Sequence, residues 1–442
     1  MMNWNTLLSA KRFGLEEFHE ERHENRSEFQ RDYDRLIFSA PFRRLQSKTQ
    51  VFPLPGSIFV HNRLTHSLEV SCVGRSLGND LAKAILSRQP ELAESYLPEI
   101  GAIVSAACLA HDLGNPPFGH SGERAISTFF SEGKGQSLKE KLTASQWEDL
   151  THFEGNANAF RLLTHQFEGR RKGGFVLTYP TLASIVKYPY ASSLAGNKSK
   201  FGFFTTEEES FRRVADELGM IKLQDNPLKY ARHPLVYLVE AADDICYQMM
   251  DLEDAHKLKI LSTEETKELL LAYFSDEKKA HRLQTLKLVT DVNEQIAYLR
   301  SCVIGLLISE CTQAFMNHEA EILNGTFEGS LIKGISPLPA KAYKHSSDVS
   351  FQKIYCSRDV LDNELAGFRI ISTLLDLMIE AVSSPEKVYS QLLINRVSSQ
   401  YNIRAHSFYE RIQAVLDYIS GMTDVFALDL YRKIKGNSLP AV

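Results

Sequence analysis

The sequence predicts an all-α protein with a large helical core, a further C-terminal helical layer and at most short β-hairpins. Apolar residues recur at three- and four-residue spacing in nine segments, which is the pattern of amphipathic helices. Only 174–179 and 201–205 are β-prone. The chain has 442 residues, of which 43% are hydrophobic, and this composition is sufficient for one large packed core. The predicted helices cover 64–88, 98–113, 121–131, 155–166, 179–187, 235–256, 290–321, 358–382 and 404–420.

Local signals set several helix boundaries. Thr65 is placed to cap the first of these helices, and Pro234 suits the first turn of the helix from Leu235 to Asp254. Gly114 and Pro116 end the helix that reaches His111-Asp112.

No fixed-period repeat or long low-complexity linker divides the chain. We therefore predict a single domain over 1–442, with a catalytic core at about 26–256 and a C-terminal helical region at about 257–442. The most irregular stretch, 324–347, is the alternative place for a division.

Composition excludes several classes of protein. The 50 basic and 55 acidic residues give a net charge of −5, so no dominant nucleic-acid-binding field is expected, although a local basic patch stays open. Residues 1–25 lack the apolar core of a signal peptide, and the longest apolar stretch, around 303–308, is too short to span a bilayer. Scattered cysteines such as Cys72, Cys108 and Cys302 are expected to be buried, reduced thiols. These features predict a cytoplasmic protein without a membrane partner.

The dipeptide His111-Asp112 is the first sign of chemistry. It follows an apolar helix and directly precedes a break, so an imidazole nitrogen and a carboxylate oxygen lie at the mouth of a core. Alone, the dipeptide is equally consistent with a capped helix end.

Two distant segments supply matching ligands. His66 begins an amphipathic helix, and Asp243 lies inside a strongly apolar one. A buried carboxylate is costly unless it is paired or binds a cation. For Asp251, on the same helix face, pairing with an arginine is the alternative; for Asp243 together with His66, His111 and Asp112 we favour a metal. This nitrogen and oxygen set suits Mn²⁺ or Mg²⁺, while Ni²⁺, Co²⁺, Fe²⁺ and Zn²⁺ also stay open.

His120 and Glu123 form a candidate acid/base pair. They are three residues apart at the start of the next predicted helix, so Glu123 can orient the imidazole. The alternative is a surface histidine beside an acid that favours the helix N-terminus. Their short distance in sequence from His111-Asp112 leads us to prefer catalysis.

Six ordered motifs resemble the bacterial dGTP triphosphohydrolases, a family of the HD-domain superfamily that is related to the SAM- and HD-domain dNTPase. The match runs through about residues 26–256, with a weaker similarity in MTDVFALDLYRKIKG (422–436). The motifs are RDYDRLIFSAPFRRLQSKTQVFP (31–53), NRLTHSLEV (62–70), HDLGNPPFGHSGE (111–123), FEGNA (153–157), LTYPTLASIVKYP (177–189) and EAADDICYQMMDLEDA (240–255).

The resemblance implies an HD-type helical core and cleavage of a dNTP, with dGTP favoured, to the deoxynucleoside and inorganic tripolyphosphate. By position, His66, His111, Asp112 and Asp243 match the metal ligands, and His120 with Glu123 matches the catalytic pair. Gln50 and Asp251 match contacts to the sugar 3′-hydroxyl, and Tyr247 matches the aromatic beneath the deoxyribose. The phosphate-side contacts match Arg63, Lys187, Tyr188 and Lys200, and His152 matches only the SAM- and HD-domain enzyme.

The resemblance also leaves features open. Asn115 stands where that related enzyme has a further histidine, and Asn is the residue of the bacterial branch. Relatives commonly assemble as hexamers, so a homo-oligomer is expected. Base preference and the role of His120 as nucleophile, base or acid are not fixed by the sequence.

Two other functions compete with dNTP hydrolysis. Another HD-type nucleotide phosphohydrolase or phosphodiesterase would share the metal ligands but would not need the group Gln50, Tyr247 and Asp251. A nucleotide sensor or nucleic-acid-binding protein with little activity is the second, and the basic loop Arg170-Arg171-Lys172 would give it a contact for single-stranded nucleic acid. For that loop we favour the alternative, a solvated hairpin tip.

Overall fold

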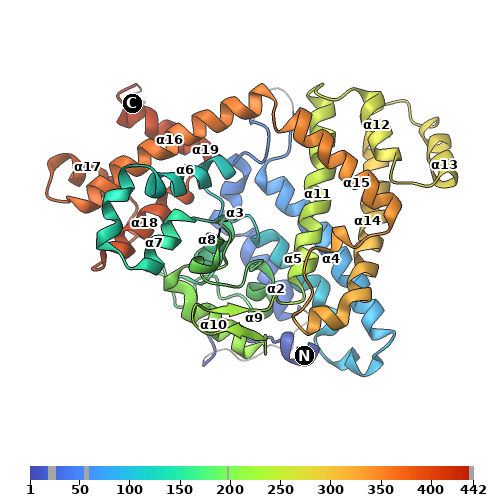
Figure 1. Ribbon diagram of the computed structural model, residues 1–442, viewed down its shortest axis with the longest axis horizontal. Helices are drawn as coiled ribbons and strands as arrows, with labels where there is room; N and C mark the ends of the chain where they lie inside the picture. Colours follow the sequence, from blue (N-terminus) through green and yellow to red (C-terminus); the bar gives the residue numbers. More distant parts are fainter. Residues whose placement is uncertain (18–25, 54–58, 197–198, 438–442) are drawn as a thin grey trace.

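A computed structural model describes residues 1–17, 26–53, 59–196 and 199–437 and confirms the all-α prediction (Figure 1). The main core is built around four helices that pack on one another, and α5 is buried along its whole length. Apolar side chains on nearly every face of α5 explain this burial, because such a helix is stable only inside a core. The four helices are α4 (Arg63–Leu86), α5 (Ile100–Ala110), α11 (Val236–Lys257) and α14 (Val292–Leu323).

A second hydrophobic cluster lies beside the main core. It is formed mainly by α6 and three helices from the C-terminal part of the chain, and α16 runs across α6 (Figure 1). The N-terminal end of α6 therefore lies where the two clusters meet. These helices are α6 (His120–Ser131), α16 (Arg358–Ser383), α18 (Phe408–Ser420) and α19 (Asp424–Ile434).

The remaining helices cover the two clusters. They are α1 (Trp4–Leu7), α2 (Glu28–Ile37), α3 (Ala40–Arg44), α7 (Ala144–Thr151), α8 (Gly155–Thr164), α9 (Tyr179–Ile185), α10 (Glu208–Glu217), α12 (Thr263–Leu271), α13 (Asp276–Leu286), α15 (Pro337–Val349) and α17 (Val388–Arg396). A π-helical turn, Ser350–Ile354, follows α15 directly.

The described β-structure is a two-stranded antiparallel sheet, and it is not where the sequence predicted it. Strands β1 (Lys222–Gln224) and β2 (Lys229–Tyr230) form this sheet with an irregular register. The predicted segments 174–179 and 201–205 form only isolated bridges. In 201–205 three phenylalanines are buried, so the apolar run that resembles a strand is a core-filling segment.

Several boundary predictions need correction. The first core helix begins at Arg63, and its cap is Asn62, whose side chain accepts the Thr65 N–H while the Thr65 hydroxyl accepts the Asn62 N–H. The stretch 324–347 is helical from Pro337 on, where α15 begins, and it also contains a 3-10 helix at Leu331–Lys333. Cys72 is exposed rather than buried.

Among the described residues, α14 is the one helix that is long and apolar enough to cross a membrane. No apolar stretch of the sequence was predicted to reach this length. It packs against α4, α11 and α12 and buries Val303, Leu307 and Phe315. A helix in a protein core meets the same criteria of length and composition, so α14 is weak evidence for a membrane span.

Candidate metal centre and active site

His111 is held in one tautomer by its own helix end. It follows α5 directly, and its Nδ1 lies 2.6 Å from the Cys108 carbonyl oxygen, so Nδ1 carries the proton and donates it. The Nε2 atom then has the free lone pair. Nε2 is buried and has no hydrogen-bond partner among the described residues. An imidazole oriented through Nδ1 with a free Nε2 is the usual form of a metal-ligating histidine.

Four side chains from three distant segments lie together and form the metal cluster: His66, His111, Asp112 and Asp243. Asp243 Oδ1 lies 3.0 Å from His66 Nε2 and 3.6 Å from His111 Nε2. Asp112 Oδ1 lies 3.6 Å from His111 Nε2. Ligand atoms of His66, His111 and Asp112 lie within 4.8 Å of one another. With metal–ligand bonds of about 2 Å, these separations fit donors that share one ion.

Electrostatics in the metal cluster favour a cation. Burial acts to raise the pKa of Asp243, but His111 and His66 overcome it and hold that pKa well below its usual range. Burial opposes a charged His111, yet Asp112 and Asp243 raise its pKa to about 9. The carboxylates thus attract positive charge to His111 Nε2, and a divalent ion there competes with the proton. The donor set and the free Nε2 therefore fit a divalent metal.

Asp112 is fixed by a second layer of contacts. Arg63 Nη1 donates to Asp112 Oδ2 at 2.7 Å, and the Asn115 amide donates to Asp112 Oδ1 at 2.5 Å. Gly119 has φ +57°, and a Cβ there would lie 2.4 Å from Arg63 Nη2. The glycine in the sequence PFGH is thus required both by the turn and by the arginine.

His120 and Glu123 make the contact that their spacing predicts. His120 Nδ1 and Glu123 Oε2 are 2.7 Å apart, and Glu123 Oε1 accepts the Gly155 N–H at 2.7 Å. The hydrogen bond with Glu123 raises the pKa of His120. The His120 side chain is 71% exposed while that of Glu123 is 11% exposed, so the imidazole can reach a ligand while its partner stays fixed.

The predicted phosphate-side cations are each paired with an acid. Lys200 Nζ lies 2.7 Å from Glu154 Oε1, and Lys187 Nζ lies 2.9 Å from Glu240 Oε1. The Tyr188 ring lies 5.8 Å from Lys187 Nζ. These two lysines can exchange an acidic partner for an incoming anion, and Arg63 adds a third cation that is held by Asp112.

Two further predicted site residues are Gln50 and His152. The Gln50 Oε1 atom is buried without a hydrogen-bond partner in the described part of the chain. His152 caps the end of α7, and its Nδ1 lies 3.1 Å from Glu148 Oε2. No described contact joins His152 to the metal cluster. The basic loop Arg170-Arg171-Lys172 is exposed, as expected for a solvated turn.

A tyrosine that the sequence did not single out completes a second group, the tyrosine cluster: Tyr247, Asp251 and Tyr355. The Tyr247 and Tyr355 rings lie 5.8 Å apart, and the Tyr355 hydroxyl donates to Asp251 Oδ2 at 2.6 Å. Burial raises the pKa of Asp251 to about 7 even though this hydrogen bond lowers it. Tyr247 lies one helical turn from Asp243 on α11, so the two clusters are neighbours.

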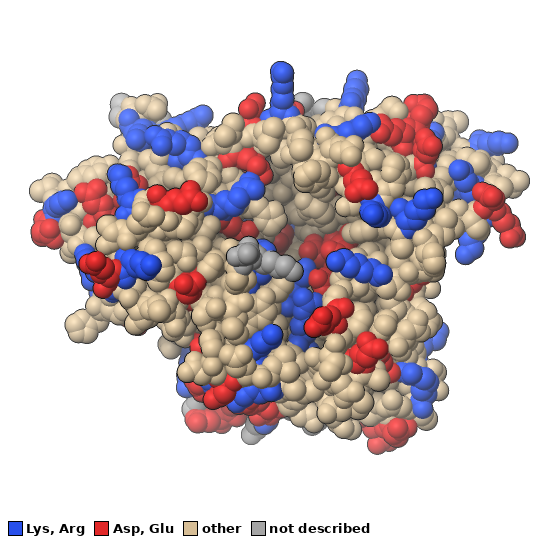
Figure 2. All heavy atoms as spheres, in the orientation of Figure 1, with Lys and Arg blue, Asp and Glu red and all other residues tan. Residues whose placement is uncertain are grey.

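The face shown in Figure 2 is hollowed at its centre, beneath α16 and between α6 and α11. Basic side chains gather along the lower edge of this hollow with acidic ones beside them, whereas charges elsewhere on the face are mixed. Such local charge can bind a polyanion although the whole chain carries −5.

Comparison with known proteins agrees with this geometry. The HD domain family model matches residues 63–186, and the phosphohydrolase-associated domain model matches residues 335–433. The chain is 36% identical to a deoxyguanosinetriphosphate triphosphohydrolase-like protein of Pseudomonas aeruginosa, over 100% of both chains. It is 37% identical to a protein of the same description from Synechocystis, over 99% of this chain and 100% of the relative. It is 31% identical to the deoxyguanosinetriphosphate triphosphohydrolase of Yersinia enterocolitica, over 97% of each.

Proposed function

This chain belongs to the deoxyguanosinetriphosphate triphosphohydrolase family of HD-domain hydrolases, and we propose that it cleaves dGTP, with other dNTPs as further substrates, to the deoxynucleoside and inorganic tripolyphosphate. The observation that carries the proposal is the convergence of the metal cluster on a free His111 Nε2. A metal centre of this kind, with an exposed imidazole on a fixed carboxylate nearby, suits hydrolysis of a phosphate ester.

The metal cluster would hold one divalent ion, with Mn²⁺ or Mg²⁺ favoured. When bound, such an ion supplies positive charge beside the α-phosphate and lowers the pKa of water. Asp112 is kept in place for this task by Arg63 and Asn115. Calorimetric titration of the metal-stripped protein with Mn²⁺ and Mg²⁺ would identify the preferred ion.

The chain's own residues would bind and orient the triphosphate. A dNTP carries close to four negative charges, and Arg63, Lys187 and Lys200 supply matching cations. Lys187 and Lys200 each have an acidic partner outside the metal cluster, so binding would exchange that carboxylate for a phosphate oxygen, while Arg63 would keep its bond to Asp112.

His120 would exchange the proton in the chemical step. Hydrolysis breaks the bond between the α-phosphorus and the 5′ oxygen, water supplies the new oxygen on phosphorus, and the 5′ oxygen must gain a proton. Glu123 holds the His120 ring through Nδ1, which leaves Nε2 for the reacting atoms.

The tyrosine cluster would select the sugar. If Tyr247 lies flat against C2′, an added 2′-hydroxyl would clash with the ring and lose its hydration. Gln50 and Asp251 would contact the 3′-hydroxyl.

Assembly into a homo-oligomer, binding of single-stranded nucleic acid and a cytoplasmic location stay predictions from the sequence, as does the single domain over 1–442.

The decisive experiment incubates the protein with each of the four dNTPs and with GTP, in Mn²⁺ or Mg²⁺, and identifies the products. We expect deoxyguanosine and tripolyphosphate from dGTP and little turnover of GTP. Release of pyrophosphate or orthophosphate instead would favour another HD-type phosphohydrolase. Binding of nucleic acid with no turnover in either metal would favour a sensor.

A further inference from the structure

The loop between α5 and α6 carries most of the chemistry and has an unfavourable backbone. It contains Asp112 and leads directly to His120. Phe118 has φ 61°, a conformation that bulky L-residues rarely adopt, and Gly119 follows with φ 57°. A backbone of this kind persists only where surrounding contacts hold it. These contacts come largely from the C-terminal part of the chain.

Asp424, the first residue of α19, uses both carboxylate oxygens to hold two backbone segments of the site. Its Oδ1 accepts the Phe118 N–H at 2.9 Å, and its Oδ2 accepts the Thr49 N–H at 2.8 Å. Phe118 lies two residues before His120, and Thr49 directly precedes Gln50. The Asp424 side chain is buried, so these charge-assisted bonds are shielded from water.

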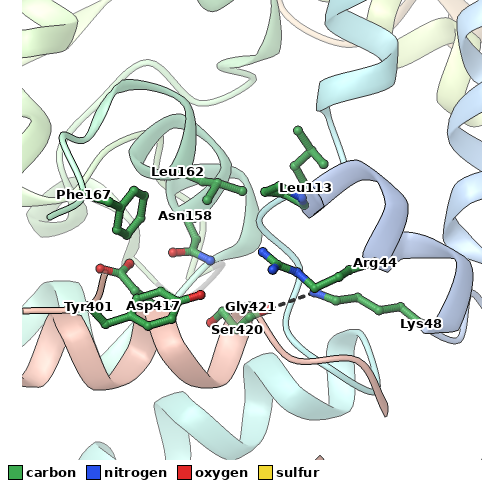
Figure 3. Close-up of a pocket in the computed structure, with 11 residues that line it drawn as sticks. Arg44, Lys48, Leu113, Asn158, Leu162, Phe167, Tyr401, Asp417, Ser420 and Gly421 are labelled. Atoms are coloured by element: carbon green, nitrogen blue, oxygen red, sulfur yellow. Dashed lines mark hydrogen bonds between the residues drawn. The ribbon is translucent and has the colours of Figure 1, made fainter. Parts of the chain in front are cut away.

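Lys48 makes a second link from the same loop to the C-terminal part of the chain. Its Nζ donates to the Asn115 carbonyl at 2.6 Å and to the Ser420 carbonyl at 2.8 Å. Figure 3 shows the Lys48 side chain extended toward the backbone of Ser420, at the end of α18. Burial lowers the pKa of Lys48 to about 7. Burying a lysine between two packed layers costs more desolvation free energy than burying an apolar residue. The two directed hydrogen bonds of Lys48 therefore indicate that it fixes the position of the loop.

Helix α16 contacts the loop and the first turn of α6 as well. The Ser121 hydroxyl donates to the Glu364 carbonyl at 2.6 Å. A Cβ on Gly367 would lie 2.5 Å from the Phe118 Cβ, so this glycine leaves the space that Phe118 occupies. The loop is therefore positioned by three helices that follow residue 357 in the chain.

We propose that Asp424 and Lys48 are positioning residues that act through Phe118 and Asn115, and that they join the loop before His120 to α18 and α19. They fix His120 relative to the metal cluster without touching substrate or metal. The proposal rests on the proposed function for its kinetic consequences, whereas the contacts themselves can be tested without substrate.

The first test is Asp424→Asn in the full-length protein. The amide keeps one acceptor oxygen and replaces the other with an N–H₂ group that cannot accept. We expect kcat for dGTP to fall about 10- to 100-fold, as when an outer-shell partner is lost, with KM changed less than about 3-fold. Calorimetric affinity for Mn²⁺ should stay within about 2-fold, because no metal-cluster contact changes. Amide exchange in the Phe118 segment, measured by mass spectrometry, should accelerate.

The matched control is Asp429→Asn, which changes a half-buried acid on the same helix that, among the described residues, pairs with Lys433. It should leave kcat and the exchange of the Phe118 segment at wild-type values. A loss of kcat in Asp429→Asn as large as that in Asp424→Asn would overturn the proposal.

Gly367→Ala perturbs the same loop from α16. The better helix propensity of alanine offsets part of the cost of displacing Phe118, and thermal unfolding would measure the remainder. We expect kcat to fall about 10-fold with Mn²⁺ affinity unchanged. Lys48→Met should behave like Asp424→Asn, since it removes both N–H donors at similar length.

Two further outcomes would overturn the proposal. One is wild-type kcat in both Asp424→Asn and Gly367→Ala; the other is a kcat loss that only follows lost Mn²⁺ affinity or lost folded protein. If the wild-type protein releases no tripolyphosphate from any dNTP, the proposed function fails by itself. The exchange measurement then still decides, and unchanged exchange of the Phe118 segment in Asp424→Asn would overturn the positioning role.

Discussion

The metal cluster and the tyrosine cluster both use α11, but they satisfy their polar atoms in different ways. In the metal cluster, His111 Nε2 is buried without a hydrogen-bond partner in the described residues, while Asp243 is held by two histidines. In the tyrosine cluster, Asp251 already has the Tyr355 hydroxyl as a donor. The first arrangement is costly unless a cation joins it, and the second is stable by itself. We therefore expect substitutions in the first to remove chemistry and in the second to change selectivity and stability.

The largest effect is expected for His111→Ala. It removes the free Nε2, so Mn²⁺ binding should be lost and dGTP turnover should fall at least about 1000-fold. The fold should survive, since α5, which ends just before His111, keeps all of its buried residues. Calorimetry, product release and thermal unfolding would be compared with His345→Ala, which changes an exposed histidine on α15. Normal Mn²⁺ binding by His111→Ala would remove the distinction between the clusters.

Glu123→Gln should have the next largest effect, with kcat about 100-fold lower, because the imidazole loses its orienting carboxylate. Glu123 raises the pKa of His120, so the limb of the kcat–pH profile that belongs to His120 should move to lower pH in the variant. The protonated pair stabilises the fold below the unfolded histidine pKa of about 6.5, and this contribution is lost as pH rises through the raised pKa. It should be small because His120 is 71% exposed. An unmoved limb would contradict the pairing.

Tyr247→Ala tests whether the tyrosine cluster selects the sugar. The ratio of kcat/KM for dGTP over GTP should fall about 10- to 100-fold, because the ring that excludes a 2′-hydroxyl is gone. Mn²⁺ affinity should be unchanged, since Tyr247 is not in the metal cluster. Unchanged discrimination between the two nucleotides would reject the selective role.

Tyr355→Phe should have the smallest effect, a change of a few-fold in KM with a pH-dependent loss of stability. Burial raises the pKa of Asp251 to about 7, so its ionisation lowers the free energy of unfolding as pH rises from about 4 through 7. Without the tyrosine hydroxyl the ionised form loses its donor, at a cost of about 1–3 kcal/mol. Thermal unfolding should therefore show a larger deficit at pH 8 than at pH 5. Tyr389→Phe, at an exposed tyrosine of α17, is the control, and an equal deficit at both pH values would argue against the contact.

Sequence reasoning located the long core helices because their apolar faces repeat over many turns. Each of the nine predicted helices occurs as a helix with ends within a few residues. Short polar helices such as α10 and α12 were missed, because their apolar positions are few and do not repeat over many turns; in α10 they are Phe211, Val214 and Ala215. The buried phenylalanines at 201–205 were predicted to form a strand, because a short apolar run resembles a strand even where it only fills the core.

The metal cluster could be proposed because its residues lie in short motifs with strong local context. Tyr355 could not, since its role depends on reaching Asp251 from 104 residues away, directly after a π-helical turn. Lys48 lies in the motif at 31–53 and Asp424 in the motif at 422–436, but neither motif indicates that the two residues contact the same loop. Pairing between distant segments is a tertiary property, and a single sequence contains little direct signal for it.

The late position of Asp424 has a consequence for biosynthesis. The residues of the metal cluster, His120 and Glu123 all precede α19 in the chain, so they are synthesised while the loop before His120 still lacks its last anchor. On the proposed function, dGTP hydrolysis would therefore begin only after α19 has been made and packed.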